Sequence, residues 1–407
     1  MFLYIDKIKF LLFSLLVLQF VNLIAQSELT QIKPFGTNPG NLKLMFYDPG
    51  NITEKEPLVV VLHGCTQTAE MCAKQSGWNK LALLHHFYVL YPEQIIVNNP
   101  ENCFNWFRSN DQERDKGEPG SIKQMIDYMV KTKQIDTTRI FIVGLSAGAA
   151  MSTIMLSVYP EVFNKGGVLA GGPYKATESV LNSGSAMLGL ISKSPENWGD
   201  LIRKQNPMFK GNYPKLAVVH GNKDIIVNPN NANQLIKQWV NIHQTDYIED
   251  EYFAQFKNYE NIELSIYKNQ NKEEVVRYYH IKDIGHTLPI DTGQCSSQGG
   301  KTGIFARDIN FHSTFWIADY FGILIPPYSI QGNTVLKPNS INNSFSIPHH
   351  NNSSYQWNTP AGMWIQGEQH GNSISIQVDE MGGTLEVIET TDTGCMEVPS
   401  RISIRVE

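Results

Sequence analysis

The sequence predicts an α/β fold, with a mostly parallel sheet covered by helices on both faces, followed by a small all-β sandwich. Short continuous apolar runs alternate with amphipathic stretches through the first three quarters of the chain, which favours a parallel sheet. After residue 326 the composition shifts to Asn and Ser. With 407 residues, 42% of them apolar and 18% charged, the chain is expected to be globular, with one large domain and a smaller one.

The N-terminus has the pattern of a secretory signal. Lys7 and Lys9 precede an apolar run over residues 11–24, which is short for a membrane span, and Ala25 is a plausible cleavage point. We therefore expect a signal peptide over residues 1–25 and a secreted, extracellular or periplasmic chain without membrane contact; the alternative is an uncleaved anchor. The net charge of −6 and the lack of a basic patch make nucleic acid an unexpected partner.

Five apolar runs predict the strands of the sheet. They are "PLVVVLHG" (57–64), "HFYVLYPE" (86–93), "RIFIVG" (139–144), "KLAVVHG" (215–221) and "EVVRYYHI" (274–281). Amphipathic stretches at 121–132, capped by Ser121, and at 231–242 predict helices between them. Residues 173–213 are too long for a simple connection, so we expect helices there that form a cap over the site. These elements place one domain over residues 26–326.

A linker is predicted over residues 327–352, because this segment is rich in Asn and Ser and poor in apolar residues. Short alternating runs then predict a β-sandwich over residues 353–407. Within it, Trp357 is expected in the sandwich core, with sugar stacking as the alternative.

The stretch Gly144-Leu145-Ser146-Ala147-Gly148 follows a predicted strand and precedes a segment of small and apolar residues. A G-x-S-x-G sequence in this position indicates a sharp strand-to-helix turn that exposes the serine, and glycines are needed where a Cβ would collide. An ordinary glycine-rich turn is the alternative. The pattern predicts Ser146 as a nucleophile.

Asp224 and His286 each follow a later predicted strand. The chain order Ser…Asp…His, with each residue just past a strand, is that of α/β-hydrolases. His286 is the expected base, and Asp224 is preferred to Asp283 as the acid that orients it, because Asp283 lies only three residues before His286. The backbone N–H groups of Cys65 and Ala147 are expected to form the oxyanion hole.

These blocks resemble the polyhydroxybutyrate depolymerase family of secreted esterases, a group that includes feruloyl and acetylxylan esterases. The resemblance covers residues 43–323, through "LHGCTQTAEMCAKQSGWNKLA", "NCFNWF", "GEPGSIKQMID", "GLSAGAAM", "HGNKDIIVNPNNANQ" and "GHTLPID". It implies an α/β-hydrolase fold with the same triad and oxyanion groups and a disulfide between Cys65 and Cys103. Trp106 and His63 are the candidate substrate contacts, and the alternative for His63 is a residue that simply marks the end of a strand. A structural role is the alternative for Trp106. The C-terminal blocks resemble PKD-like and Ig-like modules, which implies a binding, spacing or export role.

The other cysteines follow no metal-binding spacing, and no metal or organic cofactor is expected. Relatives often carry a second cysteine downstream of the "GQC" block, and the matching stretch of this chain, "ARDINFHSTFW", has none. Cys295 is therefore expected to be free or to pair with Cys72, and Cys395 to be free.

The predicted function is that of a secreted serine esterase, of polyhydroxybutyrate depolymerase type, working through an acyl-enzyme. A feruloyl or acetylxylan esterase acting on plant polysaccharide is the first alternative. A non-catalytic secreted glycan-binding protein and a serine peptidase are the others. The expected partner is a polyester or an esterified polysaccharide, with a glycan or cell-surface contact through the C-terminal module.

Overall fold

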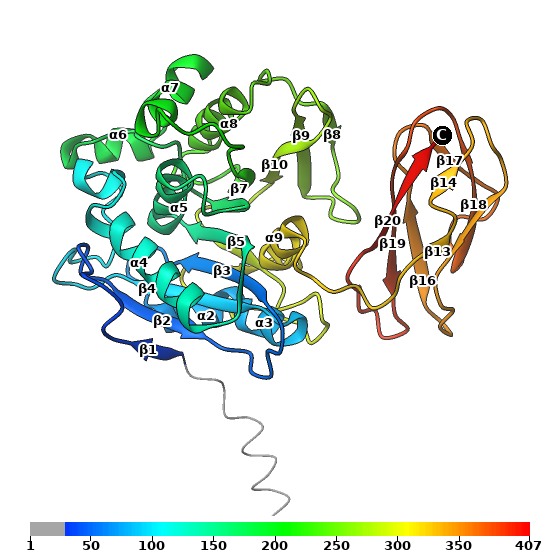
Figure 1. The fold of residues 1–407 in the computed structure, drawn as a ribbon, viewed down its shortest axis with the longest axis horizontal. Helices are drawn as coiled ribbons and strands as arrows, with labels where there is room; N and C mark the ends of the chain where they lie inside the picture. The colour runs from blue at the N-terminus through cyan, green and yellow to red at the C-terminus, as the bar shows by residue number, and fades with distance from the viewer. Residues whose placement is uncertain (1–28) are drawn as a thin grey trace, which may run out of the picture.

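The computed structural model describes residues 29–407, so the predicted signal segment lies outside the described residues. A ten-stranded sheet forms the centre of the larger body (Figure 1). Its strands, in spatial order, are β1 (Thr30–Ile32), β2 (Lys43–Tyr47), β4 (Tyr88–Glu93), β3 (Glu56–Leu62), β5 (Ile135–Leu145), β6 (Lys165–Leu169), β7 (Lys215–Gly221), β10 (Glu274–Ile281), β9 (Ile262–Lys268) and β8 (Glu251–Phe253). The six strands from β4 to β10 are parallel, and antiparallel strands extend the sheet at both edges.

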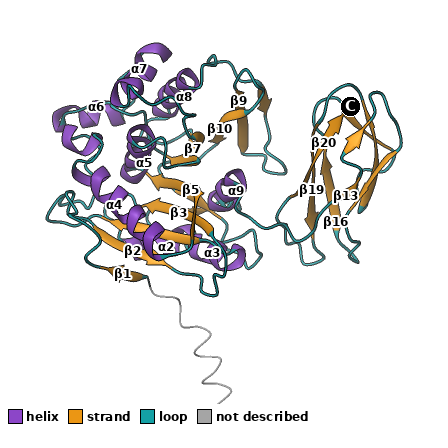
Figure 2. Cartoon of the chain, in the orientation of Figure 1, coloured by secondary structure: helices purple, strands orange, loops and turns teal. Residues whose placement is uncertain are grey.

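Helices cover both faces of this sheet (Figure 2), as the apolar runs buried on two sides require. One face packs against α4 (Gly117–Thr132), α5 (Ala147–Val158), α7 (Pro195–Gln205) and α8 (Asn230–Ile242). The other face packs against α2 (Ala69–Ser76), α3 (Trp78–His85) and α9 (Ser313–Phe321). The expected α/β-hydrolase architecture is confirmed.

Two local expectations differ from the structure. Helix α4 begins at Gly117, four residues before Ser121, and its Glu118 amide is capped by the Asp111 carboxylate at 2.8 Å. Ser121 instead accepts a hydrogen bond from the Gly40 amide.

The strand β6 was not predicted, because its two glycines break the apolar pattern. Glycine is needed at residue 166, since a Cβ added to Gly166 would lie 2.3 Å from the Leu156 side chain of α5.

The segment predicted as a cap lies between β6 and β7. It forms the short helices η2 (Val180–Asn182) and α6 (Ser183–Met187), followed by α7. After β10, a small parallel pair, β11 (Leu288–Ile290) and β12 (Ala306–Asp308), frames an irregular loop that ends near α9.

The smaller body is a sandwich of two four-stranded sheets (Figure 1). One sheet contains β13 (Gln331–Gly332), β15 (Asn343–Ser346), β18 (Ser373–Val378) and β17 (Met363–Gln366); the other contains β14 (Val335–Leu336), β20 (Ser400–Val406), β19 (Gly383–Thr390) and β16 (Ser354–Asn358). Trp357 is buried between the sheets and donates its indole N–H to the Gly371 carbonyl. It therefore fills the core, and the sugar-stacking alternative is wrong. The prediction of a linker over residues 327–352 is also wrong, because this segment contains β13, β14 and β15 and supplies side chains to the sandwich core.

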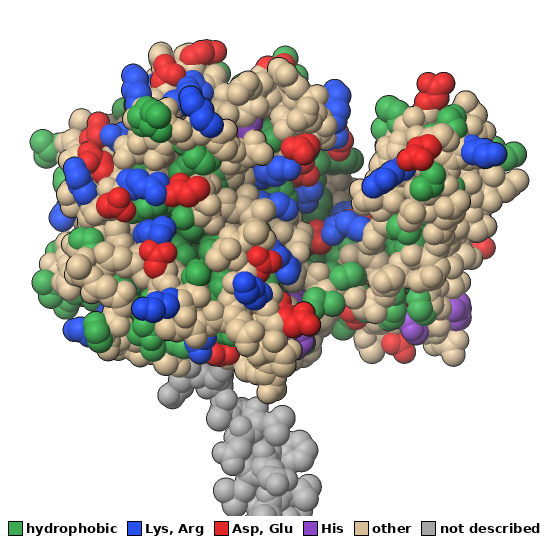
Figure 3. Space-filling view, viewed as in Figure 1, with side chains coloured by type: hydrophobic (Ala, Val, Ile, Leu, Met, Phe, Trp, Pro, Cys, Tyr) green, Lys and Arg blue, Asp and Glu red, His purple; other side chains and the backbone are tan. Residues whose placement is uncertain are grey.

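The sandwich lies at the amino edge of the large sheet. A cleft of about 1060 Å³ separates the two bodies, as Figure 3 shows, and its walls include Lys165, Lys215 and Glu274, the first residues of β6, β7 and β10. Residues that follow the other ends of the parallel strands, among them Ser146 after β5, lie at the opposite edge. The sandwich therefore does not cover the predicted site.

A disulfide, an ionic cluster and apolar contacts join the bodies. Cys295, in the loop after β11, is bonded to Cys395 of the sandwich. Arg401 of β20 makes two contacts to Asp319 of α9, at 2.6 and 2.7 Å, and Ile388 is buried in the core of the larger body. The expectation that Cys395 is free is wrong, and so is the expectation that Cys295 is free or paired with Cys72, because folding brings a cysteine of the smaller body to the "GQC" loop.

Replacing Cys395 by serine should lower the free energy of unfolding by about 2–5 kcal/mol, because the bond closes a loop of 100 residues in the unfolded chain. Thermal unfolding under non-reducing conditions measures this change. Cys295→Ser should have the same effect, and the double variant should be no less stable than either single one. An unchanged midpoint in both single variants would contradict the prediction.

Candidate active site

Ser146 occupies a strained turn between β5 and α5. Its backbone has φ 56° and ψ −118°, outside the regions that a serine normally adopts. The flanking glycines allow this turn. A Cβ at Gly148 would lie 2.3 Å from the Leu62 carbonyl oxygen, and one at Gly144 would lie 2.3 Å from the Gly148 backbone. The turn thus holds Ser146 at the carboxyl end of a central strand, as a nucleophile requires.

Asp224 and His286 lie together at the same edge. Asp224 follows β7 and His286 follows the neighbouring β10, and the His286 Nδ1 atom is 2.7 Å from Asp224 Oδ2. Both side chains are almost completely buried. A carboxylate can only accept, so Nδ1 is the donor in this contact, and in the neutral imidazole Nε2 is then the nitrogen that can accept a proton.

The Asp224 carboxylate is held in its ionised form. Its Oδ1 accepts the backbone N–H groups of Ile226 and Val227, each at 2.9 Å. Burial opposes the charge, but the nearby His220, the hydrogen bond from His286 and the backbone N–H of Val227 outweigh it and hold the Asp224 pKa well below its ordinary value. His220 Nε2 lies 3.4 Å from Asp224 Oδ2, a contact that the sequence did not indicate.

Asp283, the competing acid, lies elsewhere. Its carboxylate pairs with the Lys223 ammonium at 2.7 Å, and both side chains are about two-thirds exposed. The structure brings His286 to Asp224 and not to Asp283.

The loop after β3 lies against the nucleophile. A Cβ added to Gly64 would lie 3.6 Å from the Ser146 Cβ, so the Gly64–Cys65 backbone passes close to the hydroxyl. Ala147 is the first residue of α5, and its N–H therefore has no partner within the helix. Both predicted oxyanion residues, Cys65 and Ala147, line the pocket that contains Ser146.

A disulfide joins this loop to the next one. Cys65 is bonded to Cys103, and the Thr66 N–H donates to the Glu101 carbonyl at 2.6 Å. The two loops therefore form one wall of the site.

The pocket at Ser146 has a volume of about 160 Å³ and a mostly apolar lining. Trp106 and Phe107 form part of the wall, with their rings packed edge to face at 5.4 Å. The segment predicted as a cap contributes Pro173, Ala176 and residues of α6. The prediction missed Phe107, Val227 and Asn231, which have no motif of their own and reach the pocket only through folding.

A substrate contact by His63 is contradicted by the structure. The side chain is 1% exposed and is packed on Phe104, with ring centroids 4.9 Å apart. Its two ring nitrogens are engaged: Nδ1 donates to the Gly64 carbonyl at 2.7 Å, and Nε2 accepts from the Gln94 amide at 3.0 Å. His63 is a buried structural residue behind the pocket wall.

Residues 42–250 match the family described as "Esterase PHB depolymerase", and residues 324–405 match the PKD-like domain. Over 318 residues the chain is 40% identical to "Poly(3-hydroxyalkanoate) depolymerase C" of Paucimonas lemoignei, which covers 78% of this chain and 75% of the relative. The chain belongs to the PHB depolymerase esterase family. This esterase is thus a serine carboxylic ester hydrolase with an added PKD-like domain.

Other relatives of the esterase share less of its length. It is 30% identical over 225 residues to "Acetylxylan esterase" of Coprinopsis cinerea, which covers 54% of this chain and 60% of the relative. In structure it is similar to an acetyl xylan esterase from Aspergillus awamori, with a TM-score of 0.62 and 22% identity over 73% of this chain and 99% of that chain. This structural likeness shows the fold alone.

Within residues 29–407 of the esterase, no cluster of three or more His, Cys, Asp or Glu side chains is arranged to hold a metal ion. In the same part of the chain, no helix has the length and apolarity needed to cross a membrane.

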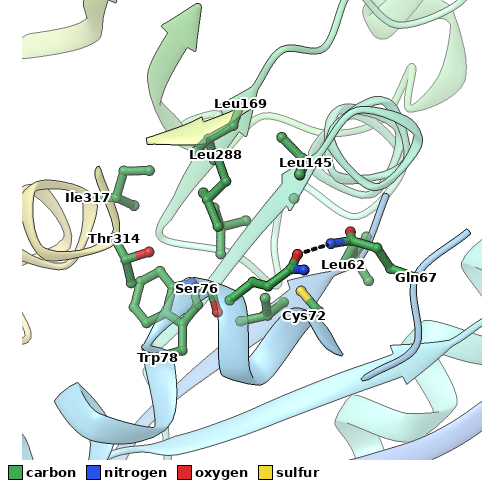
Figure 4. Close-up of a pocket in the computed structure, with 14 residues that line it drawn as sticks. Leu62, Gln67, Cys72, Ser76, Trp78, Leu145, Leu169, Leu288, Thr314 and Ile317 are labelled. Carbon is green, nitrogen blue, oxygen red and sulfur yellow. Dashed lines mark hydrogen bonds between the residues drawn. The ribbon is translucent and has the colours of Figure 1, made fainter. Parts of the chain in front are cut away.

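Cys72 remains unpaired in this esterase. Its thiol lines a small apolar cavity of about 20 Å³ under Leu145, where Gln67 also lies (Figure 4). Burial raises the pKa of the thiol to about 12, so the reactive thiolate is scarce at neutral pH. The native esterase should not react with Ellman's reagent within minutes, and the unfolded chain should release one equivalent. Rapid reaction of the native esterase, with Cys72→Ser as the blank, would contradict this.

Proposed function

We propose that the chain is a secreted depolymerase that hydrolyses poly(3-hydroxyalkanoate) esters through Ser146, His286 and Asp224. The observation that carries the proposal is the buried 2.7 Å contact between His286 and Asp224, which follow β10 and β7 at the same edge of the sheet as the strained serine turn after β5. This arrangement supplies a base, its orienting acid and a nucleophile at one edge of the sheet.

The proposed reaction has two halves. His286 Nε2 accepts the Ser146 proton while the serine oxygen attacks the ester carbonyl, and the developing oxyanion is bound by the N–H groups of Cys65 and Ala147. The protonated imidazole then gives its proton to the leaving alkoxide, which departs as an alcohol. Water, activated by the same imidazole, releases the acid and restores the serine. Asp224 stabilises the charged imidazole in both halves.

The polyester substrate is supported by the sequence relationship and by the pocket. Identity to the Paucimonas depolymerase is higher and extends over more of the chain than identity to the acetylxylan esterase. The apolar pocket of about 160 Å³, bounded by Trp106 and Phe107, is suited to a short hydroxyalkanoyl unit. The identity to acetylxylan esterases favours esterified xylan as the second candidate substrate.

We also propose that residues 1–25 direct export, that residues 26–326 form the catalytic domain, and that the sandwich, which begins with β13, acts as a binding or spacing module. The match to a PKD-like domain supports this role for the module. Its position at the amino edge of the sheet means that it would anchor the esterase with the site facing away from the cleft.

The test combines labelling with a comparison of substrates. A fluorophosphonate probe should modify the purified chain once, and peptide mass spectrometry should place the label on Ser146. The same preparation should clear a poly(3-hydroxybutyrate) film faster than it deacetylates xylan or hydrolyses methyl ferulate. Labelling at another residue would overturn the triad, and a preference for xylan or methyl ferulate would overturn the polyester assignment.

A further inference from the structure

A buried carboxyl lies directly behind the pocket wall. Glu118, in the first turn of α4, is 1% exposed and has no role in the proposed reaction. Among the described residues, three N–H groups converge on its two oxygens, and each comes from a segment next to the pocket. Burial, and then the nearby charge of Asp111, raise the Glu118 pKa. Burying a carboxyl group costs free energy unless its contacts compensate, so the contacts of Glu118 have to explain its position.

The first two contacts hold the loop that carries Trp106. The Asn105 backbone N–H donates to Glu118 Oε2 at 2.8 Å, and the Asn105 side-chain amide donates to Oε1 at 2.6 Å. Asn105 is itself 2% exposed and lies between Cys103 and Trp106, both of which line the pocket. Glu118 therefore fixes the backbone of residues 103–107, the segment that contains Trp106 and Phe107 and forms the aromatic wall of the pocket.

The third contact leads to the oxyanion loop, which is the Gly64–Cys65 segment after β3. The Gln94 side-chain amide lies 2.5 Å from Glu118 Oε1 and also donates to the Cys103 carbonyl at 3.2 Å. The Gln94 backbone N–H donates to His63, which in turn donates to the Gly64 carbonyl. A continuous chain of buried hydrogen bonds thus runs from Glu118 to the residue before Cys65.

We propose that Glu118 is a positioning residue for ester hydrolysis, which through Asn105 and Gln94 holds the aromatic wall and the oxyanion loop in register with Ser146. This inference rests on the proposed function of Ser146. A buried network of this kind is rigid only when all its members are satisfied, so a change at Glu118 is expected to reach both loops. The register matters because oxyanion donors act only when they are placed to within a fraction of an ångström.

Glu118→Gln tests the proposal with little change in shape. One oxygen becomes an NH₂ group, which has to face an N–H donor and leaves at least one buried donor unpaired. We expect kcat for a short p-nitrophenyl ester to fall and KM to rise, with kcat/KM lower by roughly 10- to 100-fold. Labelling of Ser146 by the fluorophosphonate probe should slow by a similar factor.

A matched control is Glu389→Gln in the sandwich. Glu389 is also a buried acid, with 3% exposure and a contact to His350 at 3.0 Å, but it lies far from the site in the other body. This variant is expected to unfold at a lower temperature and to keep the wild-type kcat, KM and labelling rate. Adding Asn105→Asp to Glu118→Gln should recover part of the activity, since the amide and the carboxylate then exchange places.

Gln94→Leu is the second variant, and it tests the positioning role of Glu118 if Glu118→Gln does not fold. It removes the side-chain link to Glu118 and to Cys103 but keeps the backbone bond to His63. Its kcat/KM is also expected to fall. Wild-type kinetics in whichever of the two variants folds would overturn the positioning role. Absence of probe labelling in the wild-type chain would instead overturn the proposed function.

Discussion

Ser146→Ala should reduce ester hydrolysis by a factor on the order of 10⁶, because removal of a nucleophile that acts as a unit with its base abolishes the covalent route. The fold should persist. Alanine fits the space of the serine, and the strained turn is fixed by Gly144 and Gly148 rather than by the hydroxyl. Initial rates with a p-nitrophenyl ester measure the loss, and circular dichroism monitors the fold.

Ser183→Ala provides the matched control. Ser183 lies in α6 and lines the same pocket, but its hydroxyl donates to the Val180 carbonyl. Its replacement should change kcat/KM by only a fewfold. If Ser146→Ala retained hydrolysis above about 1% of the wild type, the acyl-enzyme mechanism would be refuted.

Asp224→Asn should lower kcat by about 10⁴-fold, the size of effect expected when a catalytic imidazole is held in the wrong tautomer. The remaining oxygen should stay where the Ile226 and Val227 amides bind it. The new NH₂ group then faces His286 Nδ1, which must accept instead of donate. The imidazole proton moves to Nε2, and Nε2 can no longer accept the serine proton.

The control for this variant is Asp283→Asn, which removes an exposed acid three residues before His286 and should keep the wild-type kcat. A second measurement uses the pKa. Because the folded protein holds the Asp224 pKa below its unfolded value, the carboxylate stabilises the fold above about pH 4 and loses this effect as pH falls. The difference in the free energy of unfolding between the wild type and Asp224→Asn should therefore become smaller as the pH falls below about 4. Equal activity of the wild type and Asp224→Asn would contradict the assigned role.

The parallel core of the fold could be predicted because its strands are buried on both faces. Runs such as residues 58–62 and 140–143 are continuously apolar, and such a run can be recognised without knowing which strand lies beside it. The strand β6 and the edge strands were not predicted, because glycine and polar residues interrupt their patterns and only the neighbouring strand fixes them.

For the site, the sequence by itself determined the types and the order of the groups. A serine between two glycines, an acid and a histidine, each after a strand, imply one edge of a parallel sheet, because the carboxyl ends of such strands meet there. The same reasoning failed for His63, which also follows a strand. Whether a side chain at a strand end points into the pocket or into the core depends on its neighbours, here Phe104 and Gln94.

Only the tertiary structure decided how cysteines and polar residues far apart in the chain meet. Cys295 and Cys395 are separated by 100 residues and lie in different bodies, so neither spacing nor composition could pair them. Glu118, Asn105 and Gln94 carry no motif, and each taken alone is expected at a surface. Their burial is a property of the packed fold, in which a polar group becomes informative only when its partners are known.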